Sequence, residues 1–170
     1  KPVNEAEAVV SVVDTLVNLD SASHIRIEGL IFEHARNQAI RGTGGEGNQV
    51  IACTVRNIGG QGIHLSGGSK HLVQDCELYN LGGGGITLHG GDRKTLTPSS
   101  HTAENNHIHR YGQWNRMYKP AIAIAGVGQR VAHNLIHDAP HMAIQFSGND
   151  HVMEYNEIYN VCYESNDAGA

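Results

Sequence analysis

The fold of this chain follows from residues 52–58, which read Ala52-Cys53-Thr54-Val55-Arg56-Asn57-Ile58. The same pattern returns 23 residues later as Asp75-Cys76-Glu77-Leu78-Tyr79-Asn80-Leu81. Six such segments occur, and their apolar anchors are spaced 23, 23, 30, 28 and 22 residues apart: Phe32, Val55, Leu78, Ile108, Ile136 and Ile158. A period near 22, with short apolar runs between Gly and Asn turns, is typical of a solenoid.

Each turn of this solenoid is expected to contribute short strands that pair in parallel with the same strands of the next turn. The sequence therefore predicts an all-β fold, a single-stranded right-handed parallel β-helix of about six turns with two longer loops. A leucine-rich repeat is excluded because Leu is sparse and no stretch keeps a 3.6-residue apolar period. We expect residues 1–22 to form a lead-in segment and residues 23–170 to form the β-helix, as part of a larger protein.

Composition excludes two classes of partner. Charged residues make up 17% of the chain, the formal net charge is −5, and no basic run occurs, so we expect no nucleic-acid partner. No apolar stretch approaches the roughly 18 residues of a membrane-spanning helix, so we expect no membrane insertion. The function must therefore be sought in the faces of the coil.

Alignment of the six segments separates scaffold positions from surface positions. One inward column contains Cys53 and Cys76, which we expect to stack as free thiols because a disulfide between neighbouring turns would be strained. In later turns this column holds asparagines, which predict an asparagine ladder along the axis. These asparagines are Asn106, Asn134 and Asn156. After the anchor strand, a one-residue kink is expected at Asn57, Asn80 and Asn160, before a second inward strand that begins at Ile40, Ile63, Ile86, Ile122 and Ile144.

One outward column is the main candidate for substrate binding. Its rings, cations and polar groups suit an extended saccharide, although an ordinary half-exposed sheet face also uses Tyr and His freely. Two oversized loops, residues 90–100 and 112–121, add surface to the coil, and the second carries Trp114, which we expect to form a wall of the substrate site. The outward column consists of Glu33, Arg56, Tyr79, His109, His137 and Tyr159.

The candidate catalytic carboxylates lie near the C terminus. Asp167 is expected to act on a sugar bound across the strand face, beside Tyr163. Glycoside hydrolysis uses two carboxyl groups about 5 to 9.5 Å apart, and Glu164 and Asp138 are the candidate partners. Asp138 also neighbours Arg110, so a surface ion pair is its alternative role.

A polysaccharide lyase is the second hypothesis. A lyase needs a base near the α-carbon of a uronate and cations on the uronate carboxylate. Arg56, Arg110 and His137 would supply those groups.

Metal and cofactor sites were weighed because the chain holds 12 His. On a strand, His133 and His137 would be about 13 Å apart and His107 and His109 about 7 Å apart at Cα, too far for one ion. His109 and His137 are lateral neighbours, but no Cys or carboxylate obviously completes their shell. The glycine pattern of residues 42–47 opens no helix and so predicts no dinucleotide site. We therefore expect no metal and no cofactor.

Several phrases resemble bacterial right-handed β-helix repeat proteins, a group similar to the family 141 glycoside hydrolases and related polysaccharide-degrading enzymes. The resemblance implies a longer protein that is secreted, extracellular or periplasmic, and acts on plant or microbial glycans. It also implies an acidic active site on the strand face, with Asp167 as the one residue carried over and its partner beyond Ala170. The phrases span residues 24–33, 90–96, 103–109, 132–141 and 166–170.

The sequence thus favours a carbohydrate-active β-helix, most of all a glycoside hydrolase acting on an extracellular polysaccharide. The alternatives are a polysaccharide lyase and a non-catalytic glycan-binding or structural β-helix. The expected partners are a polysaccharide or oligosaccharide, and the remainder of a longer chain or another copy that caps the open end of the coil.

Overall fold

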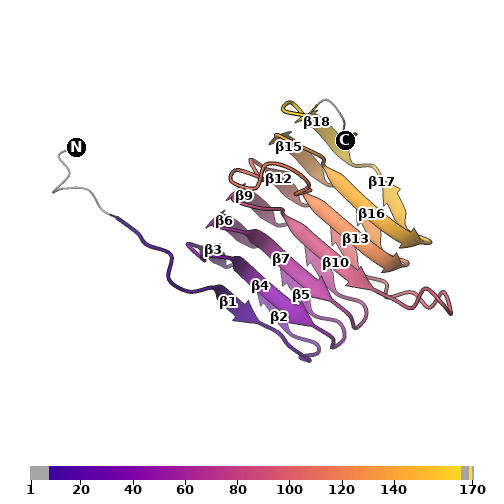
Figure 1. Ribbon diagram of the computed structural model, residues 1–170. Helices are drawn as coiled ribbons and strands as arrows, with labels where there is room; N and C mark the ends of the chain where they lie inside the picture. The colour runs from indigo at the N-terminus through magenta and orange to yellow at the C-terminus, as the bar shows by residue number, and fades with distance from the viewer. Residues whose placement is uncertain (1–7, 166–168, 170) are drawn as a thin grey trace.

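The computed structural model describes residues 8–165 and 169. Over this part of the chain the structure has 18 short strands and no helix (Figure 1). Every third strand belongs to the same sheet, which gives three parallel sheets of six strands each. The predicted right-handed parallel β-helix of about six turns is confirmed. No helix in the described residues is long and apolar enough to cross a membrane.

The three sheets are named A, B and C in the order in which the chain enters them. Sheet A contains β1 (Thr15–Asn18), β4 (Gln38–Thr43), β7 (Gln61–Ser66), β10 (Ile86–Gly90), β13 (Ile122–Val127) and β16 (Ile144–Asn149). Sheet B contains β2 (Arg26–Glu28), β5 (Gln49–Ile51), β8 (Leu72–Gln74), β11 (Thr102–Glu104), β14 (Arg130–Ala132) and β17 (Val152–Glu154). Sheet C contains β3 (Ile31–Glu33), β6 (Thr54–Ile58), β9 (Glu77–Leu81), β12 (His107–His109), β15 (Leu135–Ala139) and β18 (Glu157–Val161).

The register of the sheets is the one that the repeat predicts. In sheet C, Phe32 pairs with Val55 and the column continues through every anchor to Ile158. In sheet A, the column of Ile40, Ile63 and Ile86 is fully buried. The first strand, β1, pairs with β4 although it lies within residues 1–22, so the coil already begins inside the segment expected to be a lead-in.

Each turn bends at three corners, and one residue at each corner has left-handed φ. The predicted kink between sheets C and A is confirmed, with φ of 53° at Asn57, 53° at Asn80 and 48° at Asn160. Gly, Asn and Asp tolerate this conformation best, which explains why they mark the turns. The corner from B to C uses Gly29, Ala52, Asp75, Asn105, His133 and Tyr155, and the corner from A to B uses His24, Gly47, Lys70, Ser100, Gly128 and Asp150.

The asparagine ladder is confirmed inside the corner between sheets B and C. The Asn134 side-chain oxygen accepts hydrogen bonds from the backbone and side-chain N–H groups of Asn106, both at 3.0 Å. The Asn156 oxygen accepts the equivalent pair from Asn134 at 3.0 and 2.9 Å. Cys53 and Cys76, lower in the same column, are buried free thiols that donate to backbone carbonyls, as expected. This column is scaffold.

A second polar ladder, which the sequence analysis missed, lies inside the corner between sheets A and B. The Asn48 oxygen accepts from the Ile25 N–H, His71 Nδ1 accepts from the Asn48 N–H, and His101 Nδ1 accepts from the His71 N–H. The His71 and His101 rings stack 4.7 Å apart. The signal was present, because Asn48, His71 and His101 are spaced 23 and 30 residues apart, as the anchors are.

Acid is expected to destabilise the protein through His101. Burial lowers the pKa of this fully buried imidazole from 6.5 to about 4. The unfolded chain therefore binds the extra proton first, so stability is complete above about pH 6.5 and falls as the pH drops towards 4, by about 3 kcal/mol in total. Urea unfolding at pH 7 and pH 4.5 measures this loss.

The variant His101→Asn is the control for this pH dependence. Asn keeps a side-chain acceptor, as Asn48 does at the same ladder position, but does not titrate in this range. A loss of stability in acid as large in His101→Asn as in the wild type would refute the assignment to His101.

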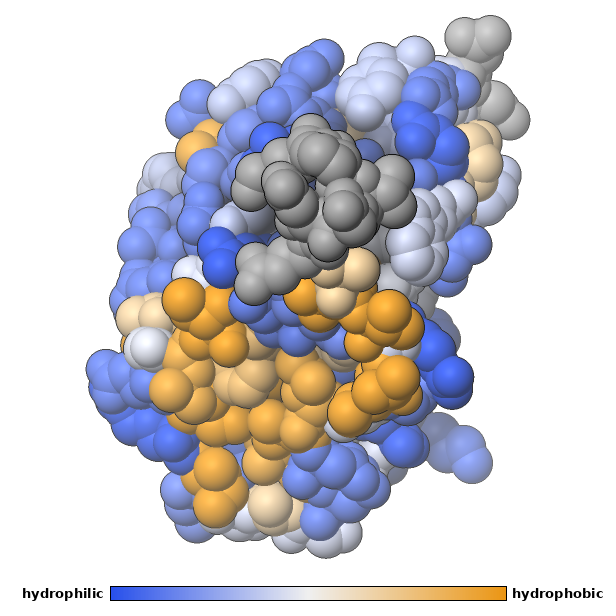
Figure 2. All heavy atoms as spheres, turned by 90° about the vertical axis from the view of Figure 1, so that its left-hand side faces the viewer, coloured by the Kyte–Doolittle hydropathy of each residue, from blue (hydrophilic) through white to orange (hydrophobic). Residues whose placement is uncertain are grey.

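Apolar side chains gather at the end of the coil formed by its first turn (Figure 2). Ile25, Leu30 and Ile31 of this turn are all exposed. An exposed apolar end of a solenoid is normally covered by a cap. That a further segment or a second copy covers it remains a prediction.

Candidate functional site

The outward column of sheet C forms a continuous stack of side chains, which we call the sheet C row: Glu33, Arg56, Tyr79, His109, His137 and Tyr159. The ring of His109 lies 5.2 Å from that of Tyr79 and 5.1 Å from that of His137, and His137 lies 4.7 Å from Tyr159. All three pairs are within 10° of parallel. The structure therefore brings five of the predicted substrate-binding residues together.

The stack leaves ring edges, rather than ring faces, open to a ligand. His109 and His137 each have a ring on both sides, and His109 is only 8% exposed. The Arg56 guanidinium donates to a Glu33 carboxylate oxygen at 2.7 Å and to the Tyr79 hydroxyl at 3.2 Å. A sugar ring thus has no free aromatic face along the middle of the row.

Two further residues, Glu77 and His107, lie on the same outer face beside the row. The His107 ring is 4.5 Å from the His109 ring, and a Glu77 oxygen is 3.7 Å from His107 Nδ1 and 3.6 Å from His109 Nε2. The expectation that His107 and His109 are too far apart for one ion was wrong. Residues i and i+2 of a strand share a face, so their rings converge although their Cα atoms do not.

The predicted carboxylates have other partners. Asp167 lies outside the described residues. Glu164 accepts two hydrogen bonds from the Arg116 guanidinium. Asp138 accepts hydrogen bonds from the Asn160 amide and, at 3.0 Å, from His137 Nδ1. The ion pair of Asp138 with Arg110 does not form: the guanidinium of Arg110 lies over the Tyr79 ring, 5.5 Å from its centre.

These contacts decide the protonation of both carboxyl groups. Hydrogen bonds from Asn160 and then His137 hold the pKa of Asp138 below its usual value, and Arg116 does the same for the pKa of Glu164. A general acid in glycoside hydrolysis needs a raised pKa. Asp138 and Glu164 therefore have the environment of anions, not of proton donors.

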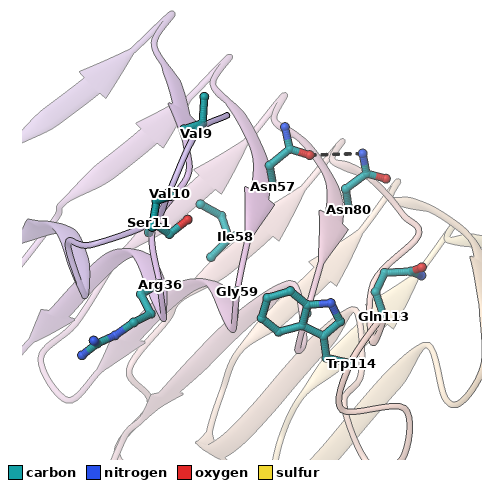
Figure 3. Close-up of a pocket in the computed structure, with 12 residues that line it drawn as sticks. Val9, Val10, Ser11, Arg36, Asn57, Ile58, Gly59, Asn80, Gln113 and Trp114 are labelled. Carbon is teal, nitrogen blue, oxygen red and sulfur yellow. Dashed lines mark hydrogen bonds between the residues drawn. The ribbon is translucent and has the colours of Figure 1, made fainter. Parts of the chain in front are cut away.

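Trp114 stands in a groove of about 610 Å³ at the corner between sheets C and A (Figure 3). The ring lies over the backbone of two turns, because a Cβ added at Gly59 or Gly82 would sit 3.4 or 3.3 Å from it. The Trp114 N–H donates to the Gly82 carbonyl, and the side chain is 76% exposed. The other lining residues are Val9, Val10, Ser11, Ala35, Arg36, Asn57, Ile58, Asn80 and Gln113.

The groove combines an apolar wall with amide groups. Val9 and Val10, from the segment before β1, form part of the wall together with Ile58. Asn80 donates to the Asn57 oxygen at 3.3 Å, so these two corner amides form a short polar edge (Figure 3). An exposed ring next to orienting amides is an arrangement suited to a polar ligand with apolar faces.

Tyr163, the remaining predicted residue, belongs to neither the row nor the groove. It is exposed and lies beside Arg116, to which it is hydrogen-bonded and whose pKa it helps to raise, after the larger effect of Glu164. The predicted site residues therefore fall into three groups: the sheet C row, the Trp114 groove and the contact of Arg116 with the C-terminal segment.

Comparison with protein families matches residues 9–160 to the family described as "Right handed beta helix region". The match covers most of the chain and agrees with the three parallel sheets. Comparison with curated proteins and with solved structures finds no match. These comparisons support the β-helix, and they give no support to the narrower resemblance to family 141 glycoside hydrolases or to a bacterial origin.

Proposed function

This chain belongs to the right-handed β-helix family, and from that premise we propose that it binds an extended polysaccharide in the Trp114 groove. The observation that carries the proposal is the exposed indole held over the glycines of two successive turns. A flat aromatic surface offers a large contact to the apolar face of a sugar ring. The amides of Asn57, Asn80 and Gln113 line the same groove and would orient the sugar hydroxyls.

The floor of the groove also fits a long ligand better than a compact one. Gly59 and Gly82 occupy the same position in successive turns, and the Gly82 N–H donates to the carbonyl of Ile58. No side chain rises from these two positions, so the floor continues along the axis of the coil. A polymer lying along the axis would meet the indole and the amides in turn.

Glycoside hydrolysis is the narrower proposal, and it depends on Asp167. The described candidates do not favour it, because Glu164 and Asp138 are hydrogen-bonded anions. A lyase is favoured still less, since the Arg56 guanidinium is engaged by Glu33 and Tyr79. We therefore place binding first and cleavage second, and we propose an extracellular or periplasmic setting, where such polysaccharides occur.

The variant Trp114→Ala is expected to weaken polysaccharide binding by about 30-fold, the effect of losing about 2 kcal/mol at a central aromatic contact. Affinity electrophoresis on a panel of neutral and acidic polysaccharides identifies the ligand, and titration calorimetry measures the change. Trp114→Phe should retain most of the binding because it keeps a ring.

Met117→Ala is the matched control, because Met117 is exposed on the same loop but does not line the groove. Equal binding by the wild type and Trp114→Ala would refute the groove as the site. Analysis of the same mixtures for shortened or unsaturated products separates hydrolase, lyase and binding protein. Product release that survives in Asp167→Asn would exclude Asp167 as the catalytic acid.

A further inference from the structure

We propose that Glu77, His107 and His109 bind a divalent transition-metal ion on the outer face of sheet C, with Zn²⁺ as the best fit. The candidate ligand atoms of these residues all lie within 4.8 Å of one another. Two imidazoles and one carboxylate form a common ligand set for Zn²⁺, and three protein ligands leave a fourth position open. The site is independent of the Trp114 groove.

The first argument is an unpartnered nitrogen. His109 is 8% exposed, and its Nε2 is buried without a hydrogen-bond partner among the described residues. The nearest anionic atom is the Glu77 oxygen at 3.6 Å, beyond the length of a hydrogen bond. A buried polar atom without a partner costs about 1–3 kcal/mol, and a bound ion between Nε2 and Glu77 would remove that cost.

The second argument follows the protons from Asp138 to His107. Asp138 is a carboxylate, so His137 Nδ1 must donate to it, at 3.0 Å. In the neutral ring, His137 Nε2 is then an acceptor, and it lies 2.8 Å from His107 Nε2, which must donate. His107 Nδ1 therefore carries a lone pair, and it is this atom that lies 3.7 Å from Glu77.

Three acceptor atoms thus converge with no proton between them: a Glu77 oxygen, His107 Nδ1 and His109 Nε2. Such a group repels itself unless a cation lies at its centre. The chain through His137 to Asp138 is also the arrangement that metal-bound histidines use, in which the second ring nitrogen donates to an outer partner. His137 and Asp138 are positioning residues in this proposal.

The site is both rigid and reachable. His109 is held between the rings of Tyr79 and His137, so its orientation is fixed before an ion arrives. The side chains of His107 and Glu77 are 38% and 46% exposed, which leaves an approach from solvent. All the groups come from paired strands, β9, β12 and β15, and not from loops.

The test is titration calorimetry of the whole chain with ZnCl₂ after treatment with a chelator. We expect one ion per chain. His109→Phe keeps a ring in the stack and removes the nitrogen, and it should abolish measurable binding. Asp138→Asn should weaken binding by about 10- to 100-fold, the usual effect of losing an outer partner of a ligand histidine.

Glu77→Gln provides a second variant in case His109→Phe does not fold, because the Glu77 side chain is half exposed and its loss leaves the core intact. His133→Asn removes an imidazole outside the cluster and should bind Zn²⁺ as the wild type does. A wild type that binds no ion, or an unchanged affinity in Glu77→Gln, would overturn the proposal. In that case the Glu77 carboxylate pairs with a protonated His109 instead.

Discussion

Asn134→Leu is expected to lower the free energy of unfolding by about 4 kcal/mol. Asn134 is buried in the middle of the asparagine ladder and takes part in all of its bonds. Its oxygen accepts from Asn106 twice, and its amide donates to the carbonyls of Ala103 and Ala132 and to Asn156. Leucine fills the volume but leaves several of these groups unpaired, at about 1–3 kcal/mol each before relaxation. Equilibrium unfolding in urea measures the loss.

The matched control is Asn156→Leu, at the half-buried end of the same ladder. Water can reach this position, so the backbone groups released there find new partners, and the loss should be about 1–2 kcal/mol. Similar losses for the two variants would mean that the asparagines act through packing rather than through hydrogen bonds.

The second large effect is expected for Gly68→Ala, with a loss of about 3 kcal/mol. Gly68 has φ of +66°, and a Cβ at this position would lie 2.0 Å from the carbonyl oxygen of Gly45 in the preceding turn. Left-handed φ alone costs an alanine about 1 kcal/mol. The remainder arises because a backbone atom must move, and that strains the pairing of two turns.

The neighbouring residue separates these two causes. Gly67 has φ of +67°, but a Cβ there would meet its nearest atom, the Gly44 nitrogen, at an ordinary 3.5 Å. Gly67→Ala should therefore lose only about 1 kcal/mol. Thermal or urea unfolding of the two variants side by side gives the difference, and equal losses would show that the contact with Gly45 is relieved without cost.

The fold could be predicted from the sequence because a solenoid repeats its local constraints. Each anchor from Phe32 to Ile158 needs an apolar residue, and each corner needs a residue that tolerates left-handed φ. The period therefore gives the register directly. It did not reveal β1, because Thr15–Asn18 has no earlier copy in the chain with which to be aligned.

The candidate site was predicted only in part, because its chemistry depends on side-chain direction. The column from Arg56 to Tyr159 was found from spacing alone. That its rings stack on one another, so that their faces are closed to a sugar, depends on rotamers that spacing does not specify. The approach of Glu77 to His109 was missed for the same reason, since Cα distances overestimate the separation of side-chain ends.

The two long turns show how the length of this chain relates to the length of the molecule. Anchor spacings of 30 and 28 residues, against 22 or 23 elsewhere, leave the pairing of Leu78 with Ile108 and of Ile108 with Ile136 unchanged. The added residues leave the coil at its corners, so the axial rise per turn stays at the strand spacing of about 4.8 Å. Axial length therefore counts turns and not residues. A protein built this way can lengthen a corner to change what it touches while every point on its strands keeps the same distance from every other.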